Sequence, residues 1–367
     1  MTVIIFLIIL AVLVFFHELG HFVVAKWSGI RVDEFGLGFP PKVFGIRYGE
    51  TLYSLNLIPF GGFVRIFGET PEELVSGVTS TPDSLIAKSK WTQALVLIAG
   101  VTANIILAWL FLSIALGVGV PMSVEGVPAS AIVEDIHLTI LTIVPGTPAA
   151  KVGLKTGDQV LLLTRAGEEL VPTSAKQAIN FISTSGDGLS IKVVTSKGET
   201  VDYRVKPEMG LIAGAPNQPA LGVILGQVGT VAFAWWQAPW QAFKMTISLT
   251  KLTVQGLGHL AVQAVQGLAT LDSVTGPVGL AGLVGDARTL GLAYLLSFVA
   301  FISINLAVLN LIPFPALDGG RLLFVLIESI KGSPIKPRIA NILNLIGFVL
   351  LLSLMFVVTW HDISRLL

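Results

Sequence analysis

The chain has 367 residues, of which 53% are hydrophobic and only 13% are charged. Soluble domains carry about 25% charged residues, so this composition excludes an ordinary soluble domain, and a disordered chain would be polar and highly charged. The 23 basic residues balance the 23 acidic ones, which removes any overall field that would attract nucleic acid. Because the chain has no cysteine, a transition metal would have to be held by His, Asp or Glu side chains.

Four segments are apolar enough and long enough to cross a membrane, for which a helix needs about 20 residues. They are residues 3–25, in which a short polar group interrupts the apolar run, and the uncharged residues 94–120, 289–317 and 339–360. The first segment lacks the basic start and small-residue cleavage site of a signal peptide, so we expect it to stay in the protein. The pattern predicts a polytopic α-helical membrane protein with four transmembrane helices, embedded in a lipid bilayer.

The polar group in the first segment is His17-Glu18-Leu19-Gly20-His21, an H-E-x-x-H motif. Successive helical residues turn about 100° and rise about 1.5 Å, so His17 and His21 lie one turn apart on one face. Their imidazoles can bind one zinc ion, with Glu18 as the general base beside it. The alternative is a structural His–Glu pair in a buried helix. It is disfavoured because each ionisable group in a membrane helix costs about 2.5–3.5 kcal/mol, and a bound cation would offset that cost for all three.

A catalytic zinc needs a third protein ligand and an open position for water. Asp318 is the natural candidate, since it ends the third apolar segment in Asn310-Leu-Ile-Pro-Phe-Pro-Ala-Leu-Asp318-Gly-Gly. The prolines bend the chain there, and the two glycines let backbone approach closely behind the carboxylate. Asp318 could equally be the N-cap of a helix that starts at Gly319, and the two roles are compatible.

Two further regions are predicted from their patterns. Residues 125–209 alternate short strands with one helix at 174–184 and have turn signals between them, which predicts one compact α+β module. Residues 231–271 carry three tryptophans followed by sparse polar residues at helical spacing, which indicates an amphipathic helix on a membrane face. Basic residues concentrate in 26–90 and 321–338, so the positive-inside rule predicts that both segments are cytoplasmic and that the α+β module is extracytoplasmic.

These motifs resemble those of the site-2 protease family of intramembrane zinc metalloproteases, and the bacterial regulator-of-sigma-E protease-like branch is the most similar. The resemblance covers nearly the whole chain: the H-E-x-x-H helix, the Asn310–Gly320 segment with Asp318 as third ligand, and three shorter elements. The shorter elements are Gly100-Val-Thr-Ala-Asn104, Gly276-Pro-Val-Gly-Leu280, and a pair at 36–40 and 58–69 that looks like the family's membrane-associated β-hairpin.

The resemblance implies roles for further residues. Asn310 would contact the substrate backbone near the zinc, and the hairpin edge at Gly61 and Gly62 would pair with an extended substrate. A plain tight turn at these glycines is the alternative. Residues 125–209 resemble a PDZ domain in Val144-Pro-Gly-Thr-Pro-Ala-Ala and Val152-Gly-Leu-Lys-Thr-Gly-Asp, with room for one such domain where a better-known member has two.

The predicted domains are a first membrane half at 1–120 with its β-hairpin at 31–66, a PDZ-like domain at 125–209, the interfacial region at 231–271, and a second membrane half at 272–367. The predicted function is a zinc metalloendopeptidase of the bacterial inner (plasma) membrane, with one Zn²⁺ per chain. It would cleave the transmembrane segment of pre-trimmed single-pass membrane proteins, as in anti-sigma factor release. The alternative is a non-proteolytic membrane scaffold or chaperone that binds chain termini through its PDZ-like domain.

Overall fold

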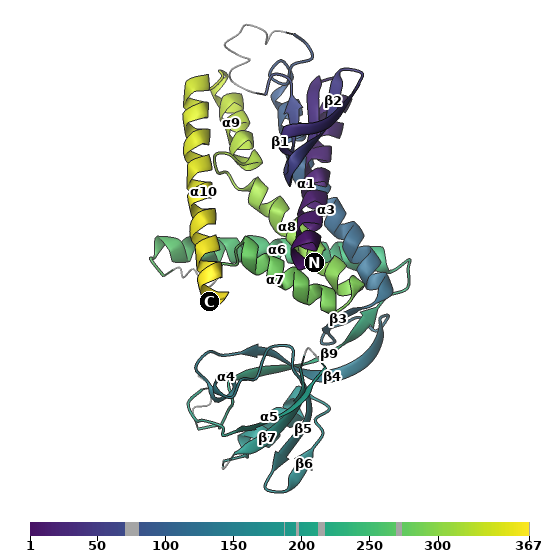
Figure 1. The fold of residues 1–367 in the computed structure, drawn as a ribbon, viewed down its shortest axis with the longest axis vertical. Helices are drawn as coiled ribbons and strands as arrows, with labels where there is room; N and C mark the ends of the chain where they lie inside the picture. Colours follow the sequence, from purple (N-terminus) through teal and green to yellow (C-terminus); the bar gives the residue numbers. More distant parts are fainter. Residues whose placement is uncertain (70–80, 187, 196–197, 212–216, 269–273, 367) are drawn as a thin grey trace. The chain divides into compact units, whose positions relative to one another are not determined.

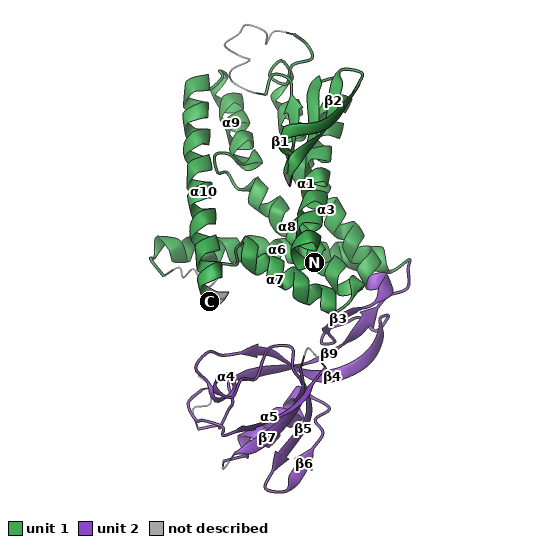
Figure 2. Cartoon of the chain, in the orientation of Figure 1, with its two compact units in different colours: residues 1–115, 236–367 green, residues 116–235 purple. Residues whose placement is uncertain are grey.

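The computed structural model describes residues 1–69, 81–186, 188–195, 198–211, 217–268 and 274–366. Two compact units make up the chain (Figure 2): a helical unit of residues 1–115 and 236–367, and a sheet unit of residues 116–235.

Among the described residues, four helices of the helical unit are long and apolar enough to cross a membrane, in agreement with the number predicted. They are α1 (Thr2–Trp27), α3 (Lys90–Val118), α8 (Leu292–Leu311) and α10 (Pro337–Leu366). Helix α8 is shorter than the uncharged segment 289–317: it begins at Leu292, after α7 has ended at Thr289, and it ends at Leu311, before Pro313 and Pro315. The described part of this unit also contains α6 (Ala238–Val265), α7 (Pro277–Thr289) and α9 (Asp318–Lys331). In Figure 1, α6 and α7 run crosswise to α10.

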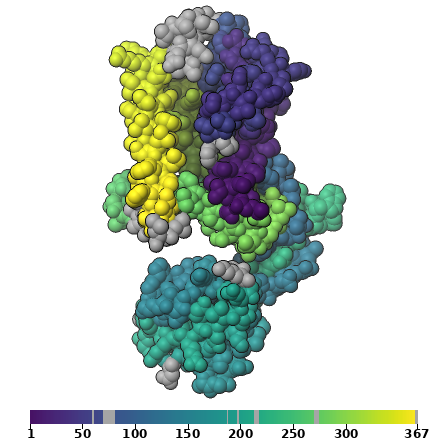
Figure 3. Space-filling model, in the orientation of Figure 1, coloured from purple at the N-terminus to yellow at the C-terminus, as the bar shows by residue number. Residues whose placement is uncertain are grey.

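Apolar side chains from α1, α3, α7 and α8 form the core of this unit, among them Leu13, Leu107, Val284 and Val299. By contrast, α10 leaves most of its apolar side chains exposed and forms an outer face along its whole length (Figure 3). The distribution fits a bundle in lipid, where an apolar exterior carries no penalty. At the end of α10, the buried carboxylate of Asp362 accepts hydrogen bonds from the backbone N–H groups of Gly276 and Gly279 at the start of α7.

A long hairpin, β1 (Val32–Tyr48) and β2 (Thr51–Ile66), follows α1 and lies within the predicted range 31–66. Strand β2 bends back over β1, so that Phe35 pairs with Tyr53 on one side and with Val64 on the other. The last part of β2 is therefore an edge segment. Gly61 and Gly62 are strand residues of β2, and Gly62 pairs with Leu37 in the ladder, so the alternative of a tight turn at these two glycines is wrong.

The sheet unit is a seven-stranded antiparallel sheet in the order β3-β9-β4-β5-β7-β8, with β6 paired to β5. Its elements are β3 (Val120–Ser123), β4 (Ile132–Ile143), α4 (Pro148–Lys151), β5 (Gln159–Arg165), β6 (Glu168–Leu170), α5 (Ala175–Ser183), β7 (Leu189–Val194), β8 (Thr200–Val205) and β9 (Val223–Ala232). Helix α5 begins at the predicted place because the Ser174 hydroxyl caps the backbone N–H of Gln177. The compact unit is longer than the predicted 125–209 module, since β3 and β9 pair outside it. Its likeness to a PDZ domain stays a prediction.

The predicted interfacial region 231–271 is not one helix. Strand β9 ends at Ala232 and α6 begins only at Ala238, so the first residues belong to the sheet unit. Trp235, Trp236 and Trp240 are exposed around the start of α6, as expected of side chains that favour a membrane interface. Residues 269–271, and 272–273 at the start of the predicted second membrane half, lie outside the described residues.

Candidate metal centre

His17 and His21 lie on the buried face of α1, with 7% and 6% of their surface exposed. Close packing between α1 and α3 buries them. A Cβ on Gly20 would lie 2.3 Å from the carbonyl oxygen of Ala99, and a Cβ on Gly100 would lie 2.3 Å from Nε2 of His21. Glycine at both positions therefore lets α3 lie directly against the two imidazoles.

Asp318 reaches the same place through the turn between α8 and α9. Helix α8 ends at Leu311, and Ala316 adopts a left-handed conformation with φ of 74°. A Cβ on Gly319 would lie 2.3 Å from the carbonyl oxygens of Leu311 and Ile312, so only glycine allows α9 to pack this closely on the turn. The N-cap alternative for Asp318 is wrong, because Leu317 is the N-cap and Asp318 is the first residue of α9.

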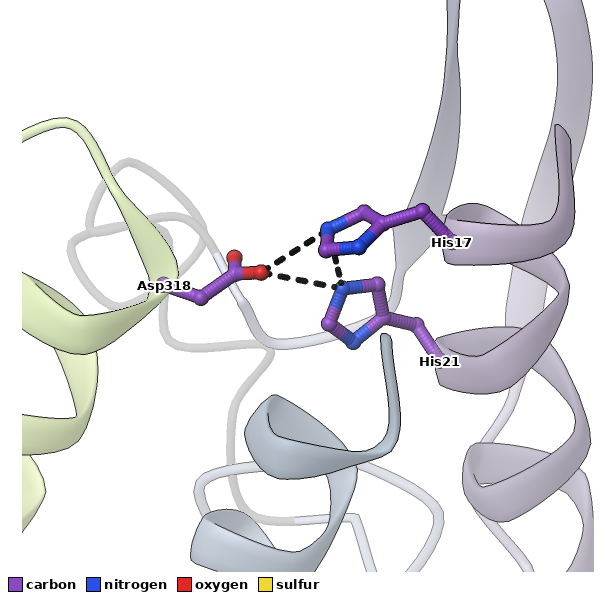
Figure 4. A group of neighbouring side chains, drawn as sticks. All are labelled: His17, His21 and Asp318. Atoms are coloured by element: carbon purple, nitrogen blue, oxygen red, sulfur yellow. Dashed lines mark hydrogen bonds and ion pairs between the residues drawn. The ribbon is translucent and has the colours of Figure 1, made fainter. Parts of the chain in front are cut away.

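Three ligating atoms converge at this point (Figure 4). Oδ2 of Asp318 lies 3.0 Å from Nε2 of His17 and 3.2 Å from Nε2 of His21, and the two Nε2 atoms are 3.3 Å apart. Donors at 2.0–2.1 Å from a tetrahedral zinc are about 3.3–3.4 Å apart, so the triangle fits a zinc ion with little adjustment. Two imidazoles and one carboxylate are also a donor set of catalytic zinc sites.

The environment of Asp318 favours a charged carboxylate. Burial raises the pKa of Asp318, but the hydrogen bonds with His17 and His21 outweigh burial and hold the pKa well below its usual range. The carboxylate is therefore ionised at neutral pH, the state in which it binds a metal ion.

The far nitrogens of both imidazoles contact α3. Nδ1 of His21 donates to the carbonyl oxygen of Val96 at 2.8 Å, and Nδ1 of His17 lies 3.3 Å from the side-chain amide of Asn104. Asn104 is fully buried. These contacts orient both rings so that their Nε2 atoms face Asp318.

A cavity of about 220 Å³ lies beside the three ligating atoms. It is lined by the histidine helix, the edge of the hairpin and the start of α9, through Glu18, His21, Phe63, Val64, Asp318 and Arg321 among others. Glu18 lines this cavity together with His21 and Val64, and a Cβ on Gly62 would lie 3.5 Å from its Cγ, so Glu18 lies between the histidines and the edge segment of β2. The cavity is large enough to hold water.

An ion pair between Glu69 and Arg321 forms part of the wall of this cavity. The same two residues also line a neighbouring cavity of about 140 Å³. The pair thus joins the chain that leaves β2 to the helix that carries Asp318, and it lies against both cavities.

The remaining predicted site residues differ in their placement. A Cβ on Gly62 would lie 3.5 Å from Cγ of Glu18, so Gly62 is next to the predicted base. Gly61 has φ of 85° and faces the ring of Phe39 instead. Asn310 lies in the last turn of α8 and is not among the described residues that line the cavity.

Three residues in or beside the site had no role in the sequence-based prediction: Asn104, Glu69 and Arg321. Two of them belong to the sequence elements named above: Asn104 ends Gly100-Val-Thr-Ala-Asn104, and Glu69 ends the element at 58–69. Nothing in the sequence indicates which side chain each of them contacts.

Comparison with known proteins supports the same chemistry. The model of peptidase family M50 matches residues 5–354. Regulator of sigma-W protease RasP of Bacillus subtilis is 31% identical over 440 residues, which cover 100% of this chain and 99% of the relative. Zinc metalloprotease RasP of Geobacillus kaustophilus is 30% identical over 446 residues, covering 99% and 98%. With its four apolar helices, the protein is a zinc intramembrane metalloprotease of a multi-pass inner-membrane type. The chain belongs to peptidase family M50, the site-2 proteases.

Proposed function

We propose that this protease cleaves the transmembrane segment of single-pass membrane proteins that another protease has already shortened, and that anti-sigma factors are among its substrates. The observation that carries the proposal is the position of Glu18. It lies on a membrane-spanning helix, between the converging side chains of His17, His21 and Asp318 and the edge of a strand. The Bacillus subtilis relative is named a regulator of sigma-W protease, which favours anti-sigma factors as the substrate class.

In this proposal His17, His21 and Asp318 hold one zinc ion. Zinc, when bound, polarises the scissile carbonyl and makes the attacking water more acidic. Glu18 takes the proton from that water and returns it to the leaving amine. Glu18 lines the cavity and lies against Gly62 of the edge segment, a position that suits a carboxylate held in place during proton transfer.

The edge segment of β2 would bind the substrate. A transmembrane helix must unwind before its peptide bonds can be attacked, and backbone groups freed within a membrane need new hydrogen-bond partners. An exposed strand edge offers such partners by strand addition. Gly62 and Phe63 lie on the edge segment next to Glu18, so a strand added there would pass the catalytic base. Asn310 is proposed to contact the substrate backbone as it enters.

The sheet unit would select substrates rather than act on them. Among its described residues no group of His, Asp and Glu side chains converges as the site residues do, so we assign it no chemistry. We propose that it is a PDZ-like domain on the extracytoplasmic side, where a shortened substrate presents its new end, and that it excludes substrates with a bulky domain.

Reconstitution tests this function directly. Purified protein in liposomes would be given a single-pass substrate with either a short tail or a folded extracytoplasmic domain. The proposal expects cleavage within the transmembrane segment of the short-tailed substrate, located by mass spectrometry, and none with Glu18→Gln. Cleavage only outside the membrane segment would contradict the intramembrane substrate class.

A further inference from the structure

Asn104 is a fully buried polar side chain in contact with the candidate metal site, and it faces the nitrogen of His17 that points away from Asp318. It is fully buried on α3, and its amide lies 3.3 Å from Nδ1 of His17. Its backbone carbonyl accepts a hydrogen bond of 2.8 Å from the hydroxyl of Ser303 on α8, which is also fully buried. The residue therefore connects three helices at the level of the site.

The direction of the two Nε2 atoms fixes where each imidazole must carry its proton. Both face Oδ2 of Asp318, so in the proposed site their lone pairs bind the metal. A neutral imidazole whose Nε2 binds a metal carries its hydrogen on Nδ1. Each ring therefore needs a hydrogen-bond acceptor at Nδ1.

His21 has such an acceptor in the carbonyl oxygen of Val96, at 2.8 Å. A carbonyl can only accept, so this contact allows one tautomer alone. For His17 the position is taken by the amide of Asn104, which can present either its nitrogen or its oxygen. If the nitrogen donated to Nδ1, the proton of His17 would be left on Nε2, where it would block the metal.

The carbonyl oxygen of Asn104 is buried, and among the described residues it has no hydrogen-bond partner. A buried oxygen without a donor costs about 1–3 kcal/mol. Turning the amide end over end exchanges its two ends and gives this oxygen the Nδ1–H of His17 as its donor. The same rearrangement moves the amide nitrogen to the place that the oxygen held, and it sets the tautomer that metal binding requires.

We propose that Asn104 is a positioning residue whose side-chain oxygen accepts a hydrogen bond from Nδ1–H of His17, and so holds His17 ready to bind zinc through Nε2. This inference rests on the proposed zinc site. Partners behind metal-binding histidines typically contribute 10- to 100-fold in metal affinity, and the same loss is expected here when the acceptor is removed.

Two substitutions separate this role from packing. Asn104→Leu keeps the volume and removes the acceptor, whereas Asn104→Asp has about the same shape and can only accept. Zinc affinity would be measured in detergent with the full-length protein by competition with a chromogenic chelator, and the visible spectrum of bound Co²⁺ would report the ligand set. Asn305→Leu on α8 is a matched control, because the amide of Asn305 donates to the Phe301 carbonyl of its own helix and, among the described residues, to no metal-site residue.

We expect Asn104→Leu to bind zinc 10- to 100-fold more weakly, and Asn104→Asp and Asn305→Leu to bind it as tightly as the parent. If Asn104→Leu does not fold, Asn104→Ala takes its place. Equal affinity in the leucine variant would show a packing role, and an aspartate variant as weak as the leucine one would show that the amide donates. Either result overturns the inference while leaving the zinc site intact. A parent protein that binds no zinc would instead overturn the site itself.

Discussion

Gly100 lies so close to His21 that a Cβ on Gly100 would be 2.3 Å from Nε2 of His21 and 2.9 Å from Cε1 of His17. Two helices meet at the site with no side chain between them. The approach lets α3 supply the Val96 and Asn104 contacts to the far sides of the two rings. The identity of residue 100 is therefore tied to the geometry of the metal site rather than to helix stability.

Gly100→Ala should accordingly displace the imidazoles and lower the zinc content. Protease activity should fall by about tenfold or more. Gly282→Ala on α7 is the control, since its Cβ would meet nothing within 4 Å. Alanine there should stabilise the helix by about 0.5–1 kcal/mol and leave activity unchanged. Metal analysis and turnover of both variants check this, and a fully active Gly100→Ala would refute the close-packing argument.

The ligands could be predicted from the sequence because their spacing alone carries the geometry. His17 and His21 share a face of any helix that contains them, and the Pro-rich turn with its Gly-Gly sequence marked Asp318. The contacts of Asn104 and Arg321 could not be predicted in this way, since their partners His17 and Glu69 lie 87 and 252 residues away in the chain.

In the sheet unit, too, local features could be predicted and long-range pairings could not. Most of its inner strands were recognisable from alternation and turn residues, because those features are local. Strands β3 and β9 lie outside the predicted module. They belong to the sheet because residues 120–123 pair with residues 228–231. A pairing between segments about a hundred residues apart leaves no mark on the composition of either one.

The Glu69–Arg321 ion pair should be coupled to catalysis. Both side chains are partly buried in the wall of the cavity, and removing one leaves the other charge without its partner. We expect Glu69→Gln and Arg321→Gln each to lower kcat/KM, and the double variant to lose less than the two effects combined, with a coupling energy of about 0.5–3 kcal/mol.

The exposed pair Lys151–Glu208 in the sheet unit is the control for that cycle. Its coupling should be near zero, because exposed ion pairs contribute little. Strictly additive effects of the Glu69 and Arg321 substitutions would mean that the ion pair has no part in shaping the site.

Topology can be tested with reporter fusions. The excess of basic residues in 26–90 and 321–338 predicts that both segments are cytoplasmic. A reporter that works only in the cytoplasm should therefore be active when it is fused after Ser89. A reporter that works only outside the cytoplasm should be active when it is fused at Gly167 of the sheet unit. Fusions that report the same compartment would be incompatible with one membrane crossing by α3.

Substrate selection by the sheet unit can be tested by deletion. Ser123 pairs with Val228 at the end of the β3–β9 ladder, so residues 124–227 can be replaced by an Asn-Gly turn that suits a two-residue hairpin. The shortened protein should bind zinc as before, and it should cleave substrates that keep a folded extracytoplasmic domain. Unchanged discrimination between short-tailed and untrimmed substrates would argue against a filter.

The central claim is that three side chains hold zinc while Glu18 moves the proton, and Glu18→Gln tests it most directly. Glutamine keeps the size of the side chain and leaves His17, His21 and Asp318 in place. Purified Glu18→Gln should contain about one zinc per chain, while its turnover of a transmembrane substrate falls by about 10²–10⁴. Asp318→Ala, as the comparison, should lose zinc and activity together. Loss of zinc from Glu18→Gln, or cleavage at the parental rate, would contradict the account.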